Sequence, residues 1–143
     1  MRILRGARMG HSFDHEKLKA YQMAIQFVAW VTPLIEQLDR SKSVRNQLDR
    51  ASTSIPLNIA EGNGKFSMKD RCRYLDIANG STVECAAALD VLVAQQWLTE
   101  DGIRDGKLIL LQILSLVMGL RREAQSRIRE QLSPLTEDSK ARV

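Results

Sequence analysis

The sequence has few aromatic residues, few residues that interrupt helices, and only two cysteines. Aromatic residues account for 5% of its 143 positions, and eight glycines and three prolines are spread along it. A β-sandwich or barrel draws on aromatic side chains and needs many turns, so this composition disfavours both folds. The 44% of apolar residues consists mainly of leucine, isoleucine, valine and alanine. We therefore predict an all-α protein with a single domain.

No segment is apolar for long enough to indicate a membrane span. The most hydrophobic one, Leu108–Leu120, has 13 residues and contains polar side chains, whereas a span needs about 20. The first ten residues carry Arg2, Arg5 and Arg8 without the apolar stretch of a signal peptide. We expect a cytoplasmic protein that has no membrane partner.

The two cysteines lie too far apart for a disulfide. Cys72 and Cys85 fall in one predicted helix, and their separation corresponds to about 20 Å along a helix axis. A disulfide cannot bridge that distance. We expect both cysteines to be reduced core residues.

No combination of residues points to catalysis or to a bound metal. His11 and His15 have the i, i+4 spacing that can place two imidazoles on one helix face, with Asp14 nearby. Asp14, however, is predicted to cap a helix, His11 precedes that helix, and no third ligand is evident. No nucleophile has an adjacent base, so we expect no enzymatic activity, no metal and no cofactor.

Four stretches have apolar residues at helical spacing, and each starts near a capping residue. The caps are Asp14, Ser43, Ser67 and Thr99, and Phe13 and Leu18 are placed to form a hydrophobic staple around the first. Proline in the second stretch, at position 56, should kink or divide that helix. The predicted helices span residues 14–38, 44–61, 67–97 and 99–129.

The short connections between these helices determine the predicted architecture. About two to five residues between long helices place neighbours antiparallel, so we predict an up-down-up-down four-helix bundle. The bundle would occupy residues 13–129. A flexible basic arm over residues 1–12 would precede it, and a disordered polar tail over residues 130–143 would follow.

The first predicted helix has apolar residues on two opposite faces. One face carries residues such as Tyr21 and Val28, and a single bundle core cannot cover both faces. The fourth helix is apolar nearly all round over Leu108–Leu120 and also needs neighbours on several sides. These features predict a homo-oligomer, because a monomer would leave one apolar face in water. The predicted interface residues are Met23, Phe27, Trp30, Val31 and Leu34.

Basic residues are concentrated at one end of the predicted bundle, which we call the basic end. The N-terminal arm, the turn between the second and third helices and the end of the fourth helix all meet there. Its cations outnumber its carboxylates, whereas the rest of the chain is net acidic. We therefore predict binding of RNA or single-stranded DNA. The predicted nucleic-acid-binding residues are Arg2, Arg5, Arg8, Lys65, Lys69, Arg71, Arg73, Arg121 and Arg122.

The alternative to nucleic-acid binding is an interaction with another protein. In that case the chain would be a scaffold or an accessory subunit, and its cations would serve only solubility. Nucleic-acid binding should weaken steeply with salt, whereas a hydrophobic protein interface should not.

Two segments carry a resemblance to a known family. The stretch from Arg50 to Gly62 (RASTSIPLNIAEG) and the stretch from Ala78 to Glu84 (ANGSTVE) resemble the four-helix-bundle family of 23S ribosomal-RNA intervening-sequence proteins. The resemblance covers about residues 13–122. Such proteins are similar to the accessory protein of diversity-generating retroelements, a basic five-subunit barrel that binds nucleic acid and a reverse transcriptase. The resemblance implies a ring-like pentamer and no enzymatic activity.

Three polar residues belong to these motif segments. Asn58, Glu61 and Glu84 are predicted to form hydrogen-bonded contacts between helices, with Arg50 as a further partner, because Glu84 shares a face with apolar residues and should be partly buried. The alternative is a direct role in binding a ligand.

Overall fold

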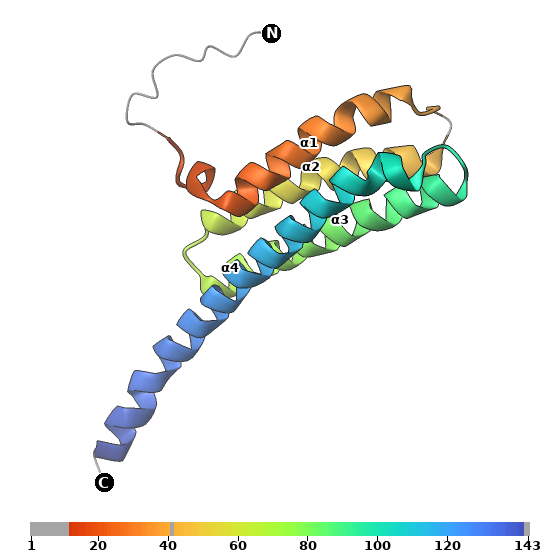
Figure 1. The fold of residues 1–143 in the computed structure, drawn as a ribbon. Helices are drawn as coiled ribbons and strands as arrows, with labels where there is room; N and C mark the ends of the chain where they lie inside the picture. The colour runs from red at the N-terminus through yellow and green to blue at the C-terminus, as the bar shows by residue number, and fades with distance from the viewer. Residues whose placement is uncertain (1–11, 41, 142–143) are drawn as a thin grey trace.

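A computed structural model describes residues 12–40 and 42–141, with side chains described as far as residue 132. Over these residues the chain forms one short 3₁₀ helix and four α-helices, without any strand. The predicted all-α fold with four helices is confirmed. The elements are η1 (Asp14–Lys17), α1 (Lys19–Gln37), α2 (Ser43–Asn63), α3 (Met68–Ala94) and α4 (Glu100–Ala141) (Figure 1).

The four α-helices form a bundle in which each packs against the next. α1 also packs against α4, so the four helices enclose a common core. Successive helices run in opposite directions (Figure 1). As a result, one end of the bundle contains η1, the turn between α2 and α3, and the C-terminal half of α4. This end is the predicted basic end.

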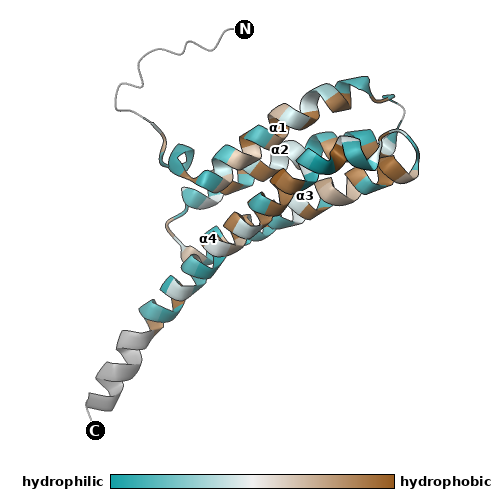
Figure 2. Ribbon diagram, viewed as in Figure 1, coloured by the Kyte–Doolittle hydropathy of each residue, from teal (hydrophilic) through white to brown (hydrophobic). Residues whose placement is uncertain are grey.

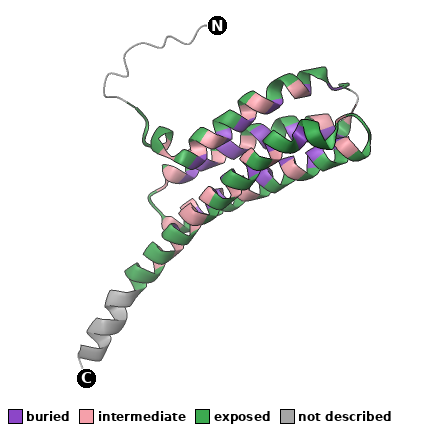
Figure 3. Ribbon diagram, in the orientation of Figure 1, coloured by how far each residue is buried: buried purple, intermediate pink, exposed green. Residues whose placement is uncertain are grey.

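The core consists of apolar side chains at helical spacing on all four helices. Hydrophobic and hydrophilic residues alternate along each helix (Figure 2), and buried positions recur along the sides of the helices that pack together (Figure 3). Burial of these apolar faces is the main favourable term that holds the helices together. The largest fully buried side chains include Phe27, Val31, Leu48, Ile55, Ile59, Leu89, Leu92, Ile113 and Val117.

Two of the four predicted helix caps are present. Ser67 Oγ accepts a hydrogen bond from the backbone N–H of Asp70 at 3.3 Å, and Thr99 Oγ1 accepts one from Gly102 at 3.0 Å. The cap predicted at Ser43 is wrong, because Ser43 is already the first residue of α2 and Lys42 precedes it without a side-chain cap.

The start of the first helix also differs from the prediction. Residues 14–17 form η1, and α1 begins only at Lys19, with Leu18 in extended conformation before it. Asp14 therefore does not cap α1. Its Oδ2 atom instead accepts a hydrogen bond from Asn63 Nδ2 at 2.9 Å, which ties η1 to the end of α2.

Two helices continue past the points where we predicted a break. α2 runs without interruption through Pro56, whose side chain is buried between the core residues Ile55 and Ile59. α4 continues to Ala141, beyond Arg129, so a helix occupies most of the region predicted to be a disordered tail. Helix propagation is cooperative, which favours extension of an established helix.

The predicted interface on α1 is wrong for two of its five residues. Phe27 and Val31 have no exposed surface in the single subunit. Met23, Trp30 and Leu34 are half-buried and pack against the same core. α1 packs against both α2 and α4, which together cover most of its apolar surface, although Ile25 remains 44% exposed.

α3 is central to the core and carries both cysteines. Cys72 and Cys85 are buried, free thiols, in agreement with their predicted separation along one helix. Within the described residues, α3 is also the one helix whose length and composition would allow it to cross a membrane. A core helix passes the same test, and nine residues of α3 are buried in this bundle.

Candidate nucleic-acid interface

Six of the nine predicted nucleic-acid-binding residues lie at the basic end in the structure. They come from the turn after α2, the first turns of α3 and the middle of α4. The remaining three, Arg2, Arg5 and Arg8, lie outside the described residues. The six that are placed differ in what their charged groups contact.

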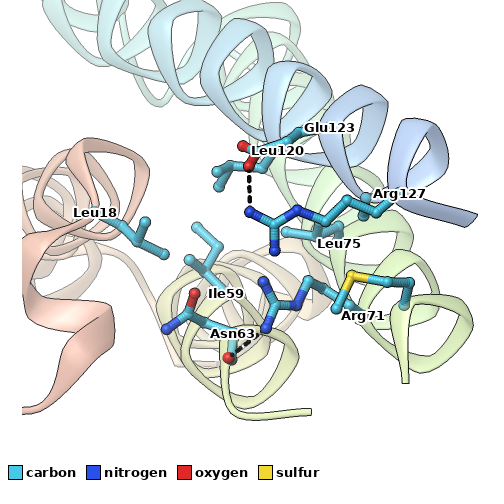
Figure 4. A pocket seen from close by; sticks show the side chains of 10 residues that line it. Leu18, Ile59, Asn63, Arg71, Leu75, Leu120, Glu123 and Arg127 are labelled. Carbon is cyan, nitrogen blue, oxygen red and sulfur yellow. Dashed lines mark hydrogen bonds and ion pairs between the residues drawn. The ribbon is translucent and has the colours of Figure 1, made fainter. Parts of the chain in front are cut away.

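Arg71 has a structural role at the end of α2. Its Nη2 atom donates hydrogen bonds to the carbonyl oxygens of Asn63 at 3.1 Å and Lys65 at 3.2 Å. The first of these contacts is drawn in Figure 4. The last carbonyls of a helix have no partner within the helix, so this guanidinium stabilises the turn between α2 and α3. Its Nε atom is buried and has no hydrogen-bond partner in the part of the chain that the structure describes.

Arg121 is paired with a carboxylate on the neighbouring helix. Its Nε atom lies 2.6 Å from Asp76 Oδ1 and its Nη2 atom 3.4 Å from Asp76 Oδ2. The hydrogen bond to Asp76, together with its charge, raises the pKa of the Arg121 guanidinium. This pair joins α3 to α4 across the bundle surface.

Two further cations contact the ring of Tyr74. Lys65 Nζ lies 5.2 Å from the ring centroid, and the Arg73 guanidinium carbon lies 5.0 Å from it. Arg73 is also 4.0 Å from a carboxylate oxygen of Asp70. Both side chains therefore have partners in the subunit, although Arg73 remains exposed.

Lys69 and Arg122 are the predicted residues whose charges are most available. Both are exposed, and neither makes a hydrogen bond or ion pair with the described part of the chain. Arg129, further along α4, is exposed in the same way. These three cations can approach phosphate groups without first breaking an internal contact.

An exposed aromatic ring beside Lys69 was missed by the sequence analysis. Phe66 lies in the turn before α3 and is fully exposed, at 101%. It lines one groove together with Lys69 on α3 and Ile128 and Leu132 on α4. A ring next to a cation is a common arrangement in proteins that bind single-stranded nucleic acid, since bases stack on the ring while the cation contacts the backbone.

A small pocket lies between the helices at the basic end (Figure 4). Its volume is about 30 Å³. Arg127 Nη2 donates a hydrogen bond to Glu123 Oε1 at 2.8 Å at the pocket wall. The i, i+4 spacing of these two residues was visible in the sequence, but their position beside Arg71 depends on how α4 packs on α3. The lining residues are Leu18, Ile59, Asn63, Met68, Arg71, Leu75, Leu120, Glu123, Ala124 and Arg127.

The predicted hydrogen-bonded role of the motif residues is wrong for Glu61 and Glu84. Both are exposed and have no hydrogen bond with the described residues. Asn58 is half-buried, but its Nδ2 atom donates within α2, to Ser54 O at 2.8 Å and to Ser54 Oγ at 2.9 Å. Ser81 Oγ on α3 makes the contact between helices, donating to Ser54 Oγ at 2.8 Å. Small serine side chains meet here because the backbones of α2 and α3 approach closely, which leaves the longer carboxylates at the surface.

Exposed apolar surface lies mainly along α3 and α4, and we call this surface the α3–α4 face. Val83 is 56% exposed and Leu111 is 60% exposed. Both line an apolar groove between the two helices. We restrict the name to the exposed apolar residues Val83 on α3 and Leu108, Leu111 and Met118 on α4; Ile77, Val91 and Leu132 are exposed on the same two helices but are not included.

The described residues contain no group of three or more His, Cys, Asp or Glu side chains that could hold a metal. The His15 ring contacts Phe13 at 5.7 Å and Tyr21 at 4.7 Å between centroids, and His11 lies outside the described residues. Burial raises the pKa of the Cys85 thiol to about 12. This thiol is therefore protonated at neutral pH, when a nucleophile would need to be a thiolate.

Comparison with known proteins identifies the family. The family model described as "23S rRNA-intervening sequence protein" matches residues 16–132. A solved structure with a similar fold is a protein of unknown function from the S23 ribosomal protein family of Bacteroides thetaiotaomicron. It has a TM-score of 0.67 at 20% identity, and the alignment covers 71% of this chain and 97% of that one. No curated protein matches the chain. The family match spans most of the sequence, including both motif segments, so the chain belongs to the family of 23S rRNA-intervening sequence proteins.

Proposed function

We propose that the protein is a non-catalytic, cytoplasmic homo-oligomer that binds single-stranded nucleic acid, and RNA in particular, at its basic end. The observation that carries this proposal is the set of exposed cations without internal partners, Lys69, Arg122 and Arg129, gathered at one end of the bundle. The family's description connects its members with intervening sequences in 23S rRNA, which supports RNA as the nucleic acid.

Phe66 supports a single strand rather than a duplex. A fully exposed ring beside Lys69 offers a surface on which an unpaired base can stack, whereas the bases of a duplex are already stacked on one another. Phosphate attraction would supply most of the affinity, and one ring distinguishes bases poorly. Binding is therefore proposed to be strongly dependent on salt and weakly dependent on sequence.

The proposed oligomer uses the α3–α4 face. Val83, Leu108, Leu111 and Met118 are exposed apolar residues on adjacent helices, and soluble monomers rarely leave a large contiguous apolar patch in water. A second copy of the chain is the proposed occupant. The ring-like form and the number five come from the family resemblance. A closed ring would gather several basic ends on one rim, so weak phosphate contacts would reinforce one another.

The alternative function is a protein-interaction scaffold. The apolar groove between α3 and α4 favours it, because this groove could take an apolar segment of a different protein as well as a second copy. Binding of that kind would depend little on salt and would not require Lys69 or Arg122.

The test is fluorescence anisotropy with a labelled single-stranded RNA at several salt concentrations. We expect the logarithm of the affinity to fall linearly with the logarithm of the salt concentration. The double variant Lys69→Gln/Arg122→Gln should bind more weakly and with a smaller slope. Arg40→Gln, which removes an exposed charge near the opposite end of the bundle, is the matched control and should bind as the unmodified protein does. An unchanged slope in the double variant would contradict the assignment of this end as the binding site.

A further inference from the structure

Two arginines from different helices line the pocket at the basic end. Arg71 comes from α3 and Arg127 from α4, and the close view shows both guanidinium groups beside the pocket (Figure 4). Arg71 is held in place by the two carbonyl oxygens that its Nη2 atom contacts. Its orientation is therefore fixed before any ligand arrives, which reduces the entropy lost on binding.

One hydrogen-bond donor of Arg71 has no partner among the described residues. Arg71 Nε is buried and makes no hydrogen bond, although a buried donor without an acceptor is costly, and more so when it is charged. The Nη2 atom of each arginine already donates a hydrogen bond. Arg71 Nη2 donates to a carbonyl oxygen at the end of α2, and Arg127 Nη2 donates to Glu123. Arg71 Nε itself is enclosed by the protein, so the remaining nitrogens of the two guanidinium groups are the ones left for an acceptor that enters the pocket.

The charge of the lining favours an anion. The lining contains two arginines and one carboxylate, Glu123, and its other side chains are uncharged. Two guanidinium groups near one small cavity repel each other, and Glu123 is engaged by Arg127 alone. An anion between the two arginines would accept from both guanidinium groups and compensate the remaining positive charge.

The size of the pocket limits what can enter. Its volume of about 30 Å³ is two to three times the roughly 10–15 Å³ that one water needs. A space of this size admits phosphate oxygens more readily than the bulkier sugar or base. An internal phosphodiester carries a sugar on each side, so a terminal phosphate can enter further than an internal one.

We propose that this pocket binds a terminal phosphate group through Arg71 and Arg127. The inference rests on the proposed function in one respect, that the phosphate belongs to a nucleic acid. Free phosphate shares the same chemistry, and the two sources are distinguished below. Glu123 opposes binding, because it adds negative charge and occupies Arg127.

The first measurement compares two RNAs of one sequence, one with a 5′-phosphate and one with a 5′-hydroxyl. We expect the 5′-phosphorylated RNA to bind about tenfold more tightly, which is the range of one or two charge-assisted hydrogen bonds. Arg127→Gln should remove this preference. Arg129→Gln is the matched control, because it removes the same charge from an exposed position on α4 outside the pocket. This variant should lower the affinity for both RNAs by the same factor, so the ratio of the two affinities should not change.

Two further variants keep the proposal testable if Arg127→Gln is unstable. Glu123→Gln removes the competing carboxylate and should raise the preference for the 5′-phosphate. Arg71→Lys keeps a charge but lacks the planar guanidinium with its several donors, so it should lower the preference. A preference that is absent, or that persists unchanged in the Arg127, Arg71 and Glu123 variants, would overturn the proposal.

The second measurement uses inorganic phosphate alone and separates this inference from the proposed function. We expect phosphate to raise the melting temperature of the unmodified protein more than chloride does at equal ionic strength, and to lose this effect in Arg127→Gln. If phosphate stabilises the protein but RNA does not bind, the pocket assignment stands and the nucleic-acid function fails. The opposite outcome is that RNA binding depends on Lys69 and Arg122 while Arg127→Gln changes neither the 5′-phosphate preference nor the stabilisation by inorganic phosphate. In that case the proposed function stands and the pocket holds only water.

Discussion

The ring of Trp30 on α1 lies directly on the backbone of Gly106 on α4. A Cβ atom at position 106 would come within 2.3 Å of the ring. No side chain other than hydrogen fits there, so this glycine allows α1 and α4 to approach and covers the face of α1 that carries Trp30. The same contact explains why Trp30, a predicted interface residue, is half-buried in the single subunit.

Gly106→Ala should therefore destabilise the subunit. An added methyl group must displace the Trp30 ring, and overpacking of this kind costs about 1–3 kcal/mol. Urea unfolding followed by circular dichroism measures the change. Gly80→Ala is the matched control, since a Cβ at position 80 has open space around it. At position 80 the higher helix propensity of alanine should stabilise the protein by up to about 1 kcal/mol. Equal changes in the free energy of unfolding at positions 80 and 106 would contradict the packing argument.

The contact between Ser81 and Ser54 should contribute measurably to the packing of α2 on α3. Ser81→Ala and Ser54→Ala should each cost about 1 kcal/mol, because each leaves a partly buried hydroxyl partner without its hydrogen bond. The double variant should cost less than the sum of the two. Additive losses in a double-mutant cycle would show that the two hydroxyls do not interact.

Leu111→Glu should dissociate the proposed oligomer without unfolding the subunit. Leu111 is exposed at 60% on the α3–α4 face, so a carboxylate remains in water in the monomer but is buried at the interface. Leu57→Glu on α2, exposed at 64%, is the control and should leave assembly unchanged. Sedimentation equilibrium measures both. A monomeric unmodified protein at micromolar concentration would contradict the oligomer itself.

Phe66→Ala should weaken the binding of single-stranded RNA without changing its salt dependence. Loss of one base–ring stack costs about 1–3 kcal/mol, which corresponds to roughly five- to 150-fold in affinity. Phe66→Trp should retain binding, and Phe66→Leu, which keeps an apolar side chain but has no ring, should not. If the leucine variant bound as tightly as the unmodified protein, stacking would not be the role of this residue.

Cys85 should make the stability of the protein decrease at alkaline pH. Its pKa is about 12 in the folded protein, against an ordinary value of 9.0. The folded state therefore holds this proton more tightly than the unfolded state, so the contribution is complete below pH 9 and is lost as the pH rises towards 12. Urea unfolding at several pH values should show this decrease, and Cys85→Ala should reduce it. A thiol reagent should react with both cysteines only after denaturation.

Local signals in the sequence predicted the helices better than the surfaces. The caps at Ser67 and Thr99 were predictable because a hydroxyl before an apolar stretch has one strong local use. The Asp14 cap was wrong because the end of α2 supplies Asn63 as a partner, and that partner is 49 positions away in the chain. The apolar faces of α1 gave no sign of which would be covered, since coverage depends on the close approach that Gly106 permits.

In the candidate site too, features set by local sequence could be predicted and features set by tertiary contacts could not. Clustering of cations at one end followed from helix order alone, so it could be predicted. The sequence could not predict which of these cations lack an internal partner. Arg71 contacts backbone carbonyls and Arg121 contacts Asp76, and neither contact has a sequence signature. Phe66 was overlooked because a single aromatic residue in a turn is indistinguishable, in sequence, from one that folds back onto the core.

The contacts between α3 and α4 repeat every seven residues, and this fixes the register of the two helices. Asp76 pairs with Arg121 and Asp90 with Lys107 at 2.6 Å each, while Val83 and Leu114, midway between these pairs, line the same apolar groove. Ion pairs this exposed add little stability. A slip of α4 by seven residues in either direction, however, would set Leu114 against an aspartate and leave charges unpaired. The α3–α4 pair therefore has one favoured alignment. That alignment determines how far α4 extends beyond the bundle and where Arg127 and Arg129 lie.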